Sequence, residues 1–136
     1  MDFSKAFVKV PHQELLCKLS NYEIINSVTL TWLKSFLSNR KQQVVLEGSM
    51  SDQVPESSGV PQGSVLGPIL FLAYINDLPW CVKSKVRLFA DDTVIYLAIK
   101  STNDCIQLQQ HLLNLEKWVS DWKMEFILHI TGKCHP

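Results

Sequence analysis

Two adjacent carboxylates, Asp91 and Asp92, are the residues of this sequence whose types and spacing most clearly indicate chemistry. Like charges this close cannot both ionise cheaply in a buried setting without a counter-charge. Apolar, β-prone runs flank them at residues 86–89 and 94–97, which predicts a hairpin with both acids at its tip. Because Mg²⁺ binds one or two carboxylates together with substrate phosphates, the pattern indicates a divalent-metal site. A solvated acidic turn is the alternative interpretation.

Helices and strands that would position these acids are predicted to alternate irregularly along the chain. Residues 2–10 predict the end of a β-strand, cut at Met1, that leads into a loop at Pro11. A short helix over 13–19 and a second helix capped by Asn26 or Ser27 follow. Its apolar face would be Val28, Trp32, Phe36 and Leu37. Two strands around a turn at Gly48 follow. The first part ends with a loop rich in glycine, serine and proline over 57–64 and a helix over 68–78 that we expect to be mostly buried.

The second part is predicted to contain the hairpin of residues 85–99, a long helix and a final strand over 124–130. Ser101 to Asp104 resembles a capping box at the start of the helix. Apolar residues then recur at steps of three and four and predict one buried stripe, formed by Cys105, Leu108, Leu112, Leu115, Val119 and Trp122. We expect the four tryptophans to pack in or beside the core. The pattern favours an α+β fold, an antiparallel sheet with helices packed on one face.

Composition limits the classes of function that remain. The chain has 136 residues, enough for one domain, and its 13 basic and 13 acidic residues cancel, so no basic tail or stripe indicates a nucleic-acid partner. The four cysteines lie far apart, which favours reduced thiols in an intracellular protein. No signal peptide or basic targeting run is visible. The apolar run over 65–75 is too short to span a bilayer, so no membrane partner is expected.

Four motifs in the chain occur in an order that is informative. They are Asp-Phe-Ser-Lys-Ala-Phe at residues 2–7, Ser-Gly-Val-Pro-Gln-Gly-Ser-Val-Leu-Gly-Pro at 58–68, Tyr-Ile-Asn-Asp-Leu-Pro at 74–79 and Phe-Ala-Asp-Asp at 89–92. With these motifs the chain resembles the reverse transcriptases of non-LTR (LINE-type) retrotransposons over nearly its whole length. The resemblance implies a partial reverse transcriptase domain over 1–136. It would be the polymerase palm, truncated at its N-terminus within the first catalytic motif, without fingers and thumb.

The resemblance also implies a mechanism and a set of partners. Asp2, Asp91 and Asp92 would be the catalytic residues and would hold two Mg²⁺ ions, for which Mn²⁺ can substitute. The reaction would be nucleotidyl transfer from a dNTP to a DNA primer 3′-hydroxyl on an RNA template, with two metal ions clamping the displacement. Action on nuclear DNA is expected from the family.

Further site residues follow from the same motifs. Phe3, Phe7, Gln62 and Gly63 are expected at the nucleotide, where the ring of Phe7 would lie beneath the sugar and exclude a 2′-hydroxyl. A core phenylalanine is the alternative for Phe7. The resemblance implies template or primer contacts for Gly59, Pro61 and Ala90, and a role for Lys133 as general acid toward the leaving pyrophosphate.

Two departures from the family pattern bear on activity. Val8 stands where the family has an aspartate, and the closing motif of the family, which ends Lys-Cys, is longer here before Lys133 and Cys134 and lacks its asparagine. These differences leave a second hypothesis open. The chain would then be a catalytically inactive, truncated remnant of such an element, and at most a weak nucleic-acid-binding module.

Overall fold

The computed structural model describes residues 2–22 and 25–127, and these fall into two compact units. Residues 7–74 form one unit, called here the helical unit, and residues 2–6 with 75–127 form the other, called here the sheet unit. Each unit is described by itself. No helix among the described residues combines the length and apolar character that crossing a membrane requires.

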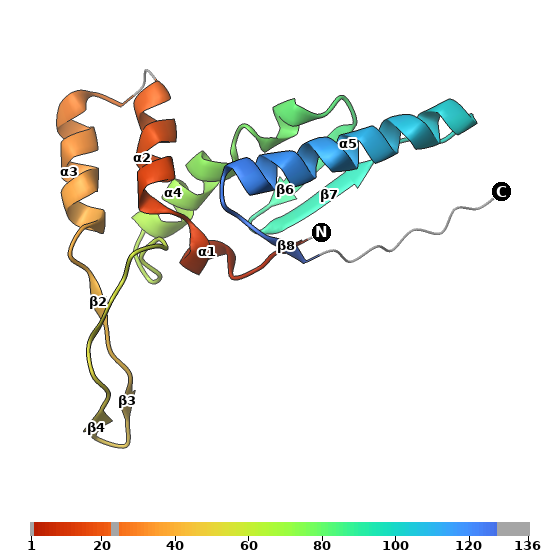
Figure 1. Cartoon of the computed structure of the whole chain (residues 1–136). Coiled ribbons are helices and arrows are strands. Elements are labelled where there is room, and N and C mark those ends of the chain that lie inside the picture. Colours follow the sequence, from red (N-terminus) through yellow and green to blue (C-terminus); the bar gives the residue numbers. More distant parts are fainter. Residues whose placement is uncertain (1, 23–24, 128–136) are drawn as a thin grey trace. The chain divides into compact units, whose positions relative to one another are not determined.

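Three helices dominate the helical unit: α2 (His12–Asn21), α3 (Ser27–Leu37) and α4 (Leu66–Ile75, whose last residue belongs to the sheet unit). A short helix, α1 (Ala6–Lys9), precedes them. Helices α2 and α3 lie side by side (Figure 1). The Asn26 side chain caps α3 by accepting a hydrogen bond of 2.8 Å from the Thr29 amide, which confirms the predicted cap. Each of these two helices buries a leucine pair, Leu15 with Leu19 and Leu33 with Leu37.

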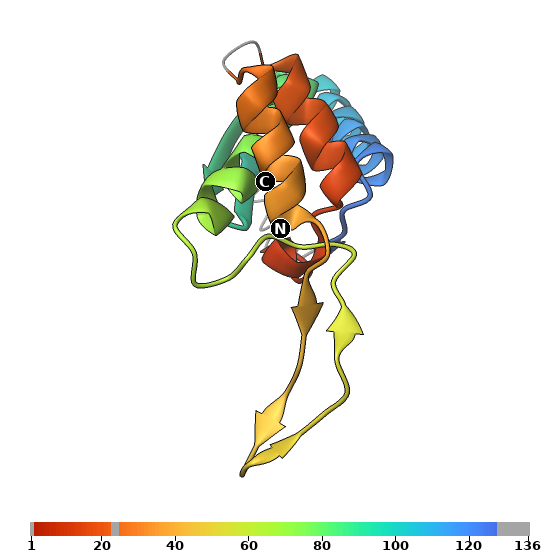
Figure 2. The same ribbon diagram turned by 90° about the vertical axis from the view of Figure 1, so that its left-hand side faces the viewer.

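A narrow β-arm extends from the helices of the same unit (Figure 2). It consists of β2 (Lys41–Gln42) paired with β5 (Val54–Pro55), and β3 (Val45–Leu46) paired with β4 (Ser49–Met50). Glu47 and Gly48 form its turn, both with positive φ, as the tightest hairpin turns require. The predicted hairpin around Gly48 is therefore confirmed. An ion pair of 3.0 Å between Arg40 and Glu56 closes its base.

Helix α4 is less buried than its apolar sequence predicts. Leu70, Phe71 and Tyr74 are buried, whereas Ile69 and Leu72 remain about half exposed, at 54% and 50%. The expectation of burial on most faces was therefore wrong, because an all-apolar sequence carries no periodicity to mark which side faces the core.

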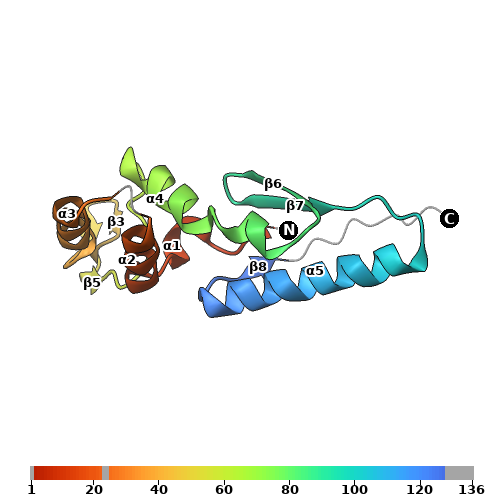
Figure 3. The ribbon, with the colours of Figure 1, turned by 90° about the horizontal axis from the view of Figure 1, so that it is seen from above.

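The sheet unit contains the four-stranded antiparallel sheet (Figure 3). Its strands are β1 (Asp2–Phe3), β6 (Lys85–Phe89), β7 (Asp92–Tyr96) and β8 (Phe126–Ile127), in the order β6-β7-β1-β8. A 3-10 helix, η1 (Leu78–Cys81), precedes β6. The long helix α5 (Thr102–Asp121) connects β7 to β8. Helices and small antiparallel sheets together make the chain an α+β protein, as predicted.

Helix α5 begins at the predicted capping box, where the Ser101 amide donates a hydrogen bond of 2.8 Å to the Asp104 carboxylate. Its buried residues are His111, Leu115, Trp118 and Val119. Trp118 packs against Phe3 of β1, with 6.4 Å between ring centroids. The predicted stripe was correct for Leu115 and Val119 but wrong for Cys105, which is exposed, because the buried face runs through His111 and Trp118 instead.

Two further expectations need correction. Among residues 2–10, which the structure describes, Asp2 and Phe3 form a strand, and the chain then turns at Ser4 and Lys5 into α1. Lys5 has a φ of 50°, a conformation that ends a strand. Trp80 is 80% exposed, so the prediction that all four tryptophans pack in or beside the core was wrong for this residue. Trp32 is 53% exposed but stacks on Phe36 with 5.2 Å between ring centroids, which agrees with packing beside the core.

Candidate active site

The β6–β7 hairpin forms where the sequence predicts it, because both strands alternate between exposed and less exposed residues. Val86, Leu88, Thr93 and Ile95 face inward, and Thr93 is 1% exposed. Such alternation with β-branched residues is typical of a sheet with one covered face. Phe89 lies opposite Asp92 in the register. The turn therefore contains only Ala90 and Asp91, and Asp92 begins β7.

Ala90 adopts an unusual backbone conformation in this turn, with a φ of 50°. Two-residue hairpin turns need a positive φ at their first central position, and glycine is the usual residue there. An L-residue in the left-handed region costs roughly 1–2 kcal/mol. The turn that carries Asp91 is thus held in a strained conformation by the pairing on either side of it.

The sheet brings the first motif of the chain to this hairpin. Asp2 of β1 lies directly opposite Asp92 of β7 in an antiparallel register. The Phe3 amide also donates a hydrogen bond of 3.3 Å to the carbonyl of Asp91. Directly opposed residues in antiparallel strands have Cα atoms about 4.5–5.5 Å apart. The backbones of Asp2, Asp91 and Asp92 therefore meet at one place, although most of the chain separates the first from the other two.

The carboxylates of the hairpin are accessible. Asp91 is half-buried and Asp92 is exposed, and within the described part of the chain neither side-chain carboxylate forms a hydrogen bond or an ion pair. Among the side chains that the structure describes, which do not include that of Asp2, no three possible metal ligands form a group. Unpaired carboxylates at a shared sheet position suit a hard divalent cation.

Phe3 lies in the core of the sheet unit. Its ring is 2% exposed and packs against Phe126, with 4.5 Å between centroids. This packing fixes β1 between its two neighbours and so supports Asp2. A direct nucleotide contact by Phe3 remains a prediction, and one that the burial of the ring disfavours.

In the helical unit, the loop over 57–65 is bound to the segment that follows the first motif. The Gly59 amide donates to the Val10 carbonyl at 2.8 Å, and the Val60 amide donates to the Phe7 carbonyl at 2.7 Å. His12 Nε2 contacts the Gly59 carbonyl at 2.7 Å. These bonds hold the loop in one conformation. His12 was not among the site residues predicted from the sequence.

The two glycines of this loop have different reasons to be glycine. Gly59 has a φ of 97°, and a Cβ placed on it would lie 2.9 Å from the Val8 carbonyl oxygen. Its missing side chain therefore makes room for the protein's own backbone. Gly63 has a φ of 77°, and a Cβ placed on it would meet no atom within 4 Å, so open space lies beside it. Gln62 next to it is exposed, and Pro61 is buried.

The remaining predicted residues are placed as follows. Phe7 is half-buried and its ring packs against Phe71 of α4, with 4.7 Å between centroids. This favours the alternative of a packing role for at least one face of the ring. Val8, at the position of the missing aspartate, is 51% exposed. Lys133 lies outside the described residues.

Sequence reasoning missed Lys18, which is 4% exposed. Its ammonium group donates a hydrogen bond of 2.7 Å to the Tyr74 carbonyl, and the Tyr22 hydroxyl donates one of 3.0 Å to the Ala73 carbonyl. Both carbonyls belong to the last turn of α4, where no intrahelical donor is available. Lys18 and Tyr22 therefore cap α4. The signal in the sequence was a lysine within the apolar face of a predicted helix.

Comparison with known proteins gives a consistent result. The sequence model of the family described as "Reverse transcriptase (RNA-dependent DNA polymerase)" matches residues 1–131. The chain is 31% identical over 133 residues to the RNA-directed DNA polymerase from mobile element jockey of Drosophila melanogaster, which covers 91% of this chain. It is also 31% identical over 132 residues to the probable RNA-directed DNA polymerase from transposon BS of the same species, over 90% of this chain. The jockey polymerase of Drosophila funebris is 30% identical and covers 98%. The chain spans only about 14–15% of the length of these relatives.

Proposed function

Because the chain belongs to the reverse transcriptase family, we propose that it forms the catalytic palm of an RNA-directed DNA polymerase of a non-LTR retrotransposon. The sheet unit would be the palm sheet. The reaction would add a nucleotide from a dNTP to the 3′-hydroxyl of a DNA primer, directed by an RNA template. The motifs predict both the reverse transcriptase family and a non-LTR retrotransposon as the kind of mobile element. The similarity to the polymerases of jockey and BS agrees with both predictions.

One observation carries the proposal. Asp2 lies opposite Asp92, and Asp91 occupies the adjoining turn. Three carboxyl-bearing residues from two distant motifs therefore meet at one end of the hairpin. A divalent cation would bind such an arrangement, because it neutralises carboxylates gathered in one place.

Asp2, Asp91 and Asp92 would hold two divalent ions, Mg²⁺ or, in its place, Mn²⁺. When bound, such ions lower the pKa of the attacking hydroxyl and stabilise the charge on the transferring phosphoryl group. The protein's own contribution is to fix its carboxylates. The strained turn at Ala90 directs Asp91, and the buried ring of Phe3 anchors the strand of Asp2. Fixed groups of this kind need little rearrangement during the reaction.

The other site residues are proposed from the family resemblance. Gln62 and Gly63 would contact the incoming nucleotide, for which the exposure of Gln62 and the open space beside Gly63 are favourable. Ala90 would lie near the primer or template, and Gly59 and Pro61 would shape the loop rather than contact nucleic acid through side chains. Phe7 would discriminate the sugar with the part of its ring not covered by Phe71.

Primer extension tests the proposed activity. The chain is assayed on a poly(rA) template with an oligo(dT) primer and Mg²⁺ or Mn²⁺, beside an Asp91→Asn, Asp92→Asn double variant. A matched control carries Asp52→Asn and Asp121→Asn, two exposed aspartates outside the site. We expect slow, non-processive extension by the unaltered chain and the control, and none by the site variant. If all three folded proteins fail to extend the primer, the chain is the inactive remnant.

Metal binding provides a second readout that does not depend on activity. Calorimetric titration with Mg²⁺ should show binding to the unaltered chain and the matched control, and weaker binding to Asp91→Asn. Equal binding by all three proteins would show that the three aspartates do not form the metal site.

A further inference from the structure

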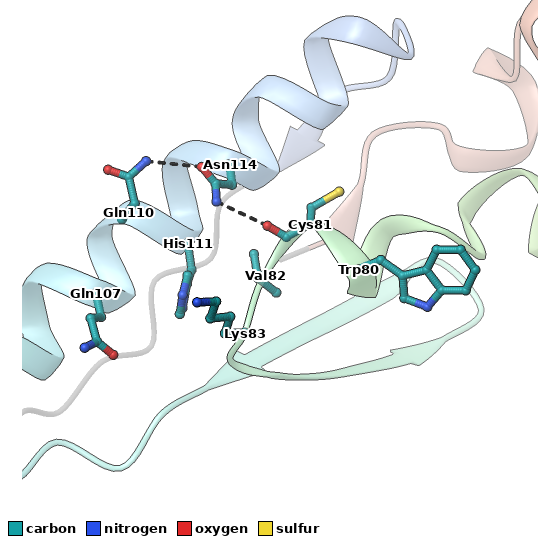
Figure 4. A pocket seen from close by; sticks show the side chains of 8 residues that line it. All are labelled: Trp80, Cys81, Val82, Lys83, Gln107, Gln110, His111 and Asn114. Carbon is teal, nitrogen blue, oxygen red and sulfur yellow. Dashed lines mark hydrogen bonds between the residues drawn. The ribbon is translucent and has the colours of Figure 1, made fainter.

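A second candidate site lies within the sheet unit, apart from the aspartates. A pocket of about 470 Å³ opens between the segment Trp80 to Lys83 and helix α5 (Figure 4). Pockets of about 300–1,000 Å³ are typical of small-molecule sites. Its polar groups come from Lys83, His111 and three amides, those of Gln107, Gln110 and Asn114.

Hydrogen bonds hold the walls of the pocket in place. The Asn114 side chain donates to the Cys81 carbonyl at 3.2 Å, which ties α5 to the segment after η1. The same side chain accepts from Gln110 at 3.1 Å. His111 Nδ1 and the Ser84 hydroxyl lie 2.6 Å apart, which connects α5 to the start of β6. These hydrogen bonds fix α5 against the segment that leads into β6.

His111 directs an available ring nitrogen into this pocket. The residue is 8% exposed, and its Nδ1 is engaged with Ser84. Within the described part of the chain, its Nε2 has no hydrogen-bond partner. Nε2 is not among the buried polar atoms that lack a hydrogen-bond partner, so it is open to solvent. Figure 4 shows the ring on the pocket wall beside Lys83, so a ligand in the pocket can form a hydrogen bond with Nε2.

The charge of the pocket favours an anion. Lys83 is the charged residue on its wall, and none of the described acidic residues lines it. Residues 78–90 contain Lys83, Lys85 and Arg87 but no aspartate or glutamate. Although the whole chain is neutral, this stretch is locally basic. A phosphate group placed between Lys83 and His111 would find two donors, since a neutral or protonated imidazole can donate through Nε2.

Trp80 supplies an aromatic surface at the edge of the pocket. Its indole is 80% exposed, which is unusual for a residue whose large apolar area favours burial. Exposed aromatic rings beside cationic groups are the typical platform on which nucleic acids stack their bases. The Gln107 amide carries a donor and an acceptor and, unlike the Asn114 amide, is not used in the hydrogen bonds of the pocket wall, which suits the polar edge of a base.

We propose that this pocket binds a nucleoside 5′-phosphate unit, with its base stacked on Trp80 and its phosphate held by Lys83 and His111. The unit comes either from a free mononucleotide or from one residue of a single-stranded RNA. The site is distinct from the aspartates, because Lys83 precedes β6 and the Ala90–Asp91 turn follows it. A five-residue strand separates them by about 17 Å. The proposal does not depend on polymerase activity.

Binding measurements without divalent metal test the proposal. The full chain is titrated in EDTA, which disables the proposed polymerase site, with inorganic phosphate, with AMP or UMP, and with a single-stranded RNA octamer. Lys83→Gln and Trp80→Ala alter exposed residues of the pocket, and Lys117→Gln removes the same charge from an exposed position of α5 outside it. The Asp91→Asn, Asp92→Asn variant serves as an independent control.

We expect AMP or UMP to bind more tightly than phosphate, with about tenfold weaker binding in each pocket variant. Lys117→Gln and the double aspartate variant should bind within about twofold of the unaltered chain. If the octamer binds more tightly than the mononucleotide, the natural ligand is a residue of single-stranded RNA. If the two bind equally, the natural ligand is a free nucleotide. The proposal is refuted if no nucleotide binds, if phosphate binds equally well, or if Lys117→Gln weakens binding as much as Lys83→Gln does. Loss of primer extension alone would leave it standing.

Discussion

Gly59→Ala tests whether the loop over 57–65 is held by close backbone contact rather than by flexibility. Gly59 has a φ of 97°, and a Cβ there would lie 2.9 Å from the Val8 carbonyl oxygen and 3.2 Å from that of Phe7. Both atoms belong to the backbone and cannot rotate away as a side chain can. An alanine must therefore displace the loop. Gly63→Ala is the matched control, because Gly63 also has a positive φ, 77°, but has open space beside it.

The expected losses follow from these two geometries. Each alanine costs roughly 1–2 kcal/mol for the left-handed backbone. Displacing Gly59 also weakens the hydrogen bonds from the Gly59 amide to Val10 and from the Val60 amide to Phe7, each worth about 0.5–1.5 kcal/mol. We therefore expect Gly59→Ala to lower the free energy of unfolding by about 2–5 kcal/mol and Gly63→Ala by about 1–2 kcal/mol.

Urea denaturation followed by circular dichroism measures the difference. With a slope of about 1–3 kcal/mol per molar urea, the midpoint of Gly59→Ala should lie lower than that of Gly63→Ala by roughly 1 M. If the two variants lose the same stability, then only the backbone conformation matters and the close approach to Val8 is not a constraint. If Gly59→Ala is as stable as the unaltered chain, the arrangement of the loop is wrong.

Three further predictions follow from the packing and the charges. Leu115→Ala should lower the free energy of unfolding by about 2–5 kcal/mol, because Leu115 is 1% exposed. The control Leu113→Ala should lower it by under ~1 kcal/mol, because Leu113 is 47% exposed. Equal losses in urea denaturation would contradict the assignment of the buried face of α5. Lys18→Met should cost about 2 kcal/mol, since the last turn of α4 loses the buried ammonium cap, and an unchanged urea midpoint would show that the cap contributes nothing. Hydrogen bonds from the Lys100 amide and from the Ser101 hydroxyl and amide lower the pKa of Asp104. The stabilisation by its carboxylate is therefore present above the pKa of the unfolded state and is lost as pH falls through the lowered folded-state pKa. Asp104→Asn should flatten the acid side of the plot of unfolding free energy against pH, and identical plots for the two proteins would refute this.

Several features of the fold could be predicted from the sequence because they depend on neighbours along the chain. The cap at Asn26, the capping box at Asp104 and the tight turn at Gly48 were all confirmed, since each needs only residues a few positions apart. The β6–β7 hairpin belongs with them, because two β-prone runs close together in the sequence mark it locally, although Asp92 begins β7 and does not lie in the turn.

The errors share a physical cause. Helix α4 is apolar all round, so its sequence could not say that Ile69 and Leu72 face outward. The tryptophans show the same limitation. Trp118 packs on Phe3 while Trp80 stays exposed, and both are equally apolar as residues. Burial depends on which surface another element covers, and that element is usually distant in the chain.

The sequence by itself determined the family, the hairpin that carries Asp91 and Asp92, and the capped starts of α3 and α5, because motifs and local periodicity need no knowledge of distant contacts. Only the tertiary structure decided that Asp2 pairs opposite Asp92, that Lys18 caps α4, and that His111 points into a pocket beside Lys83. These arrangements join residues far apart in the sequence. They are set by strand register and by packing between elements, which no pattern along the chain encodes directly.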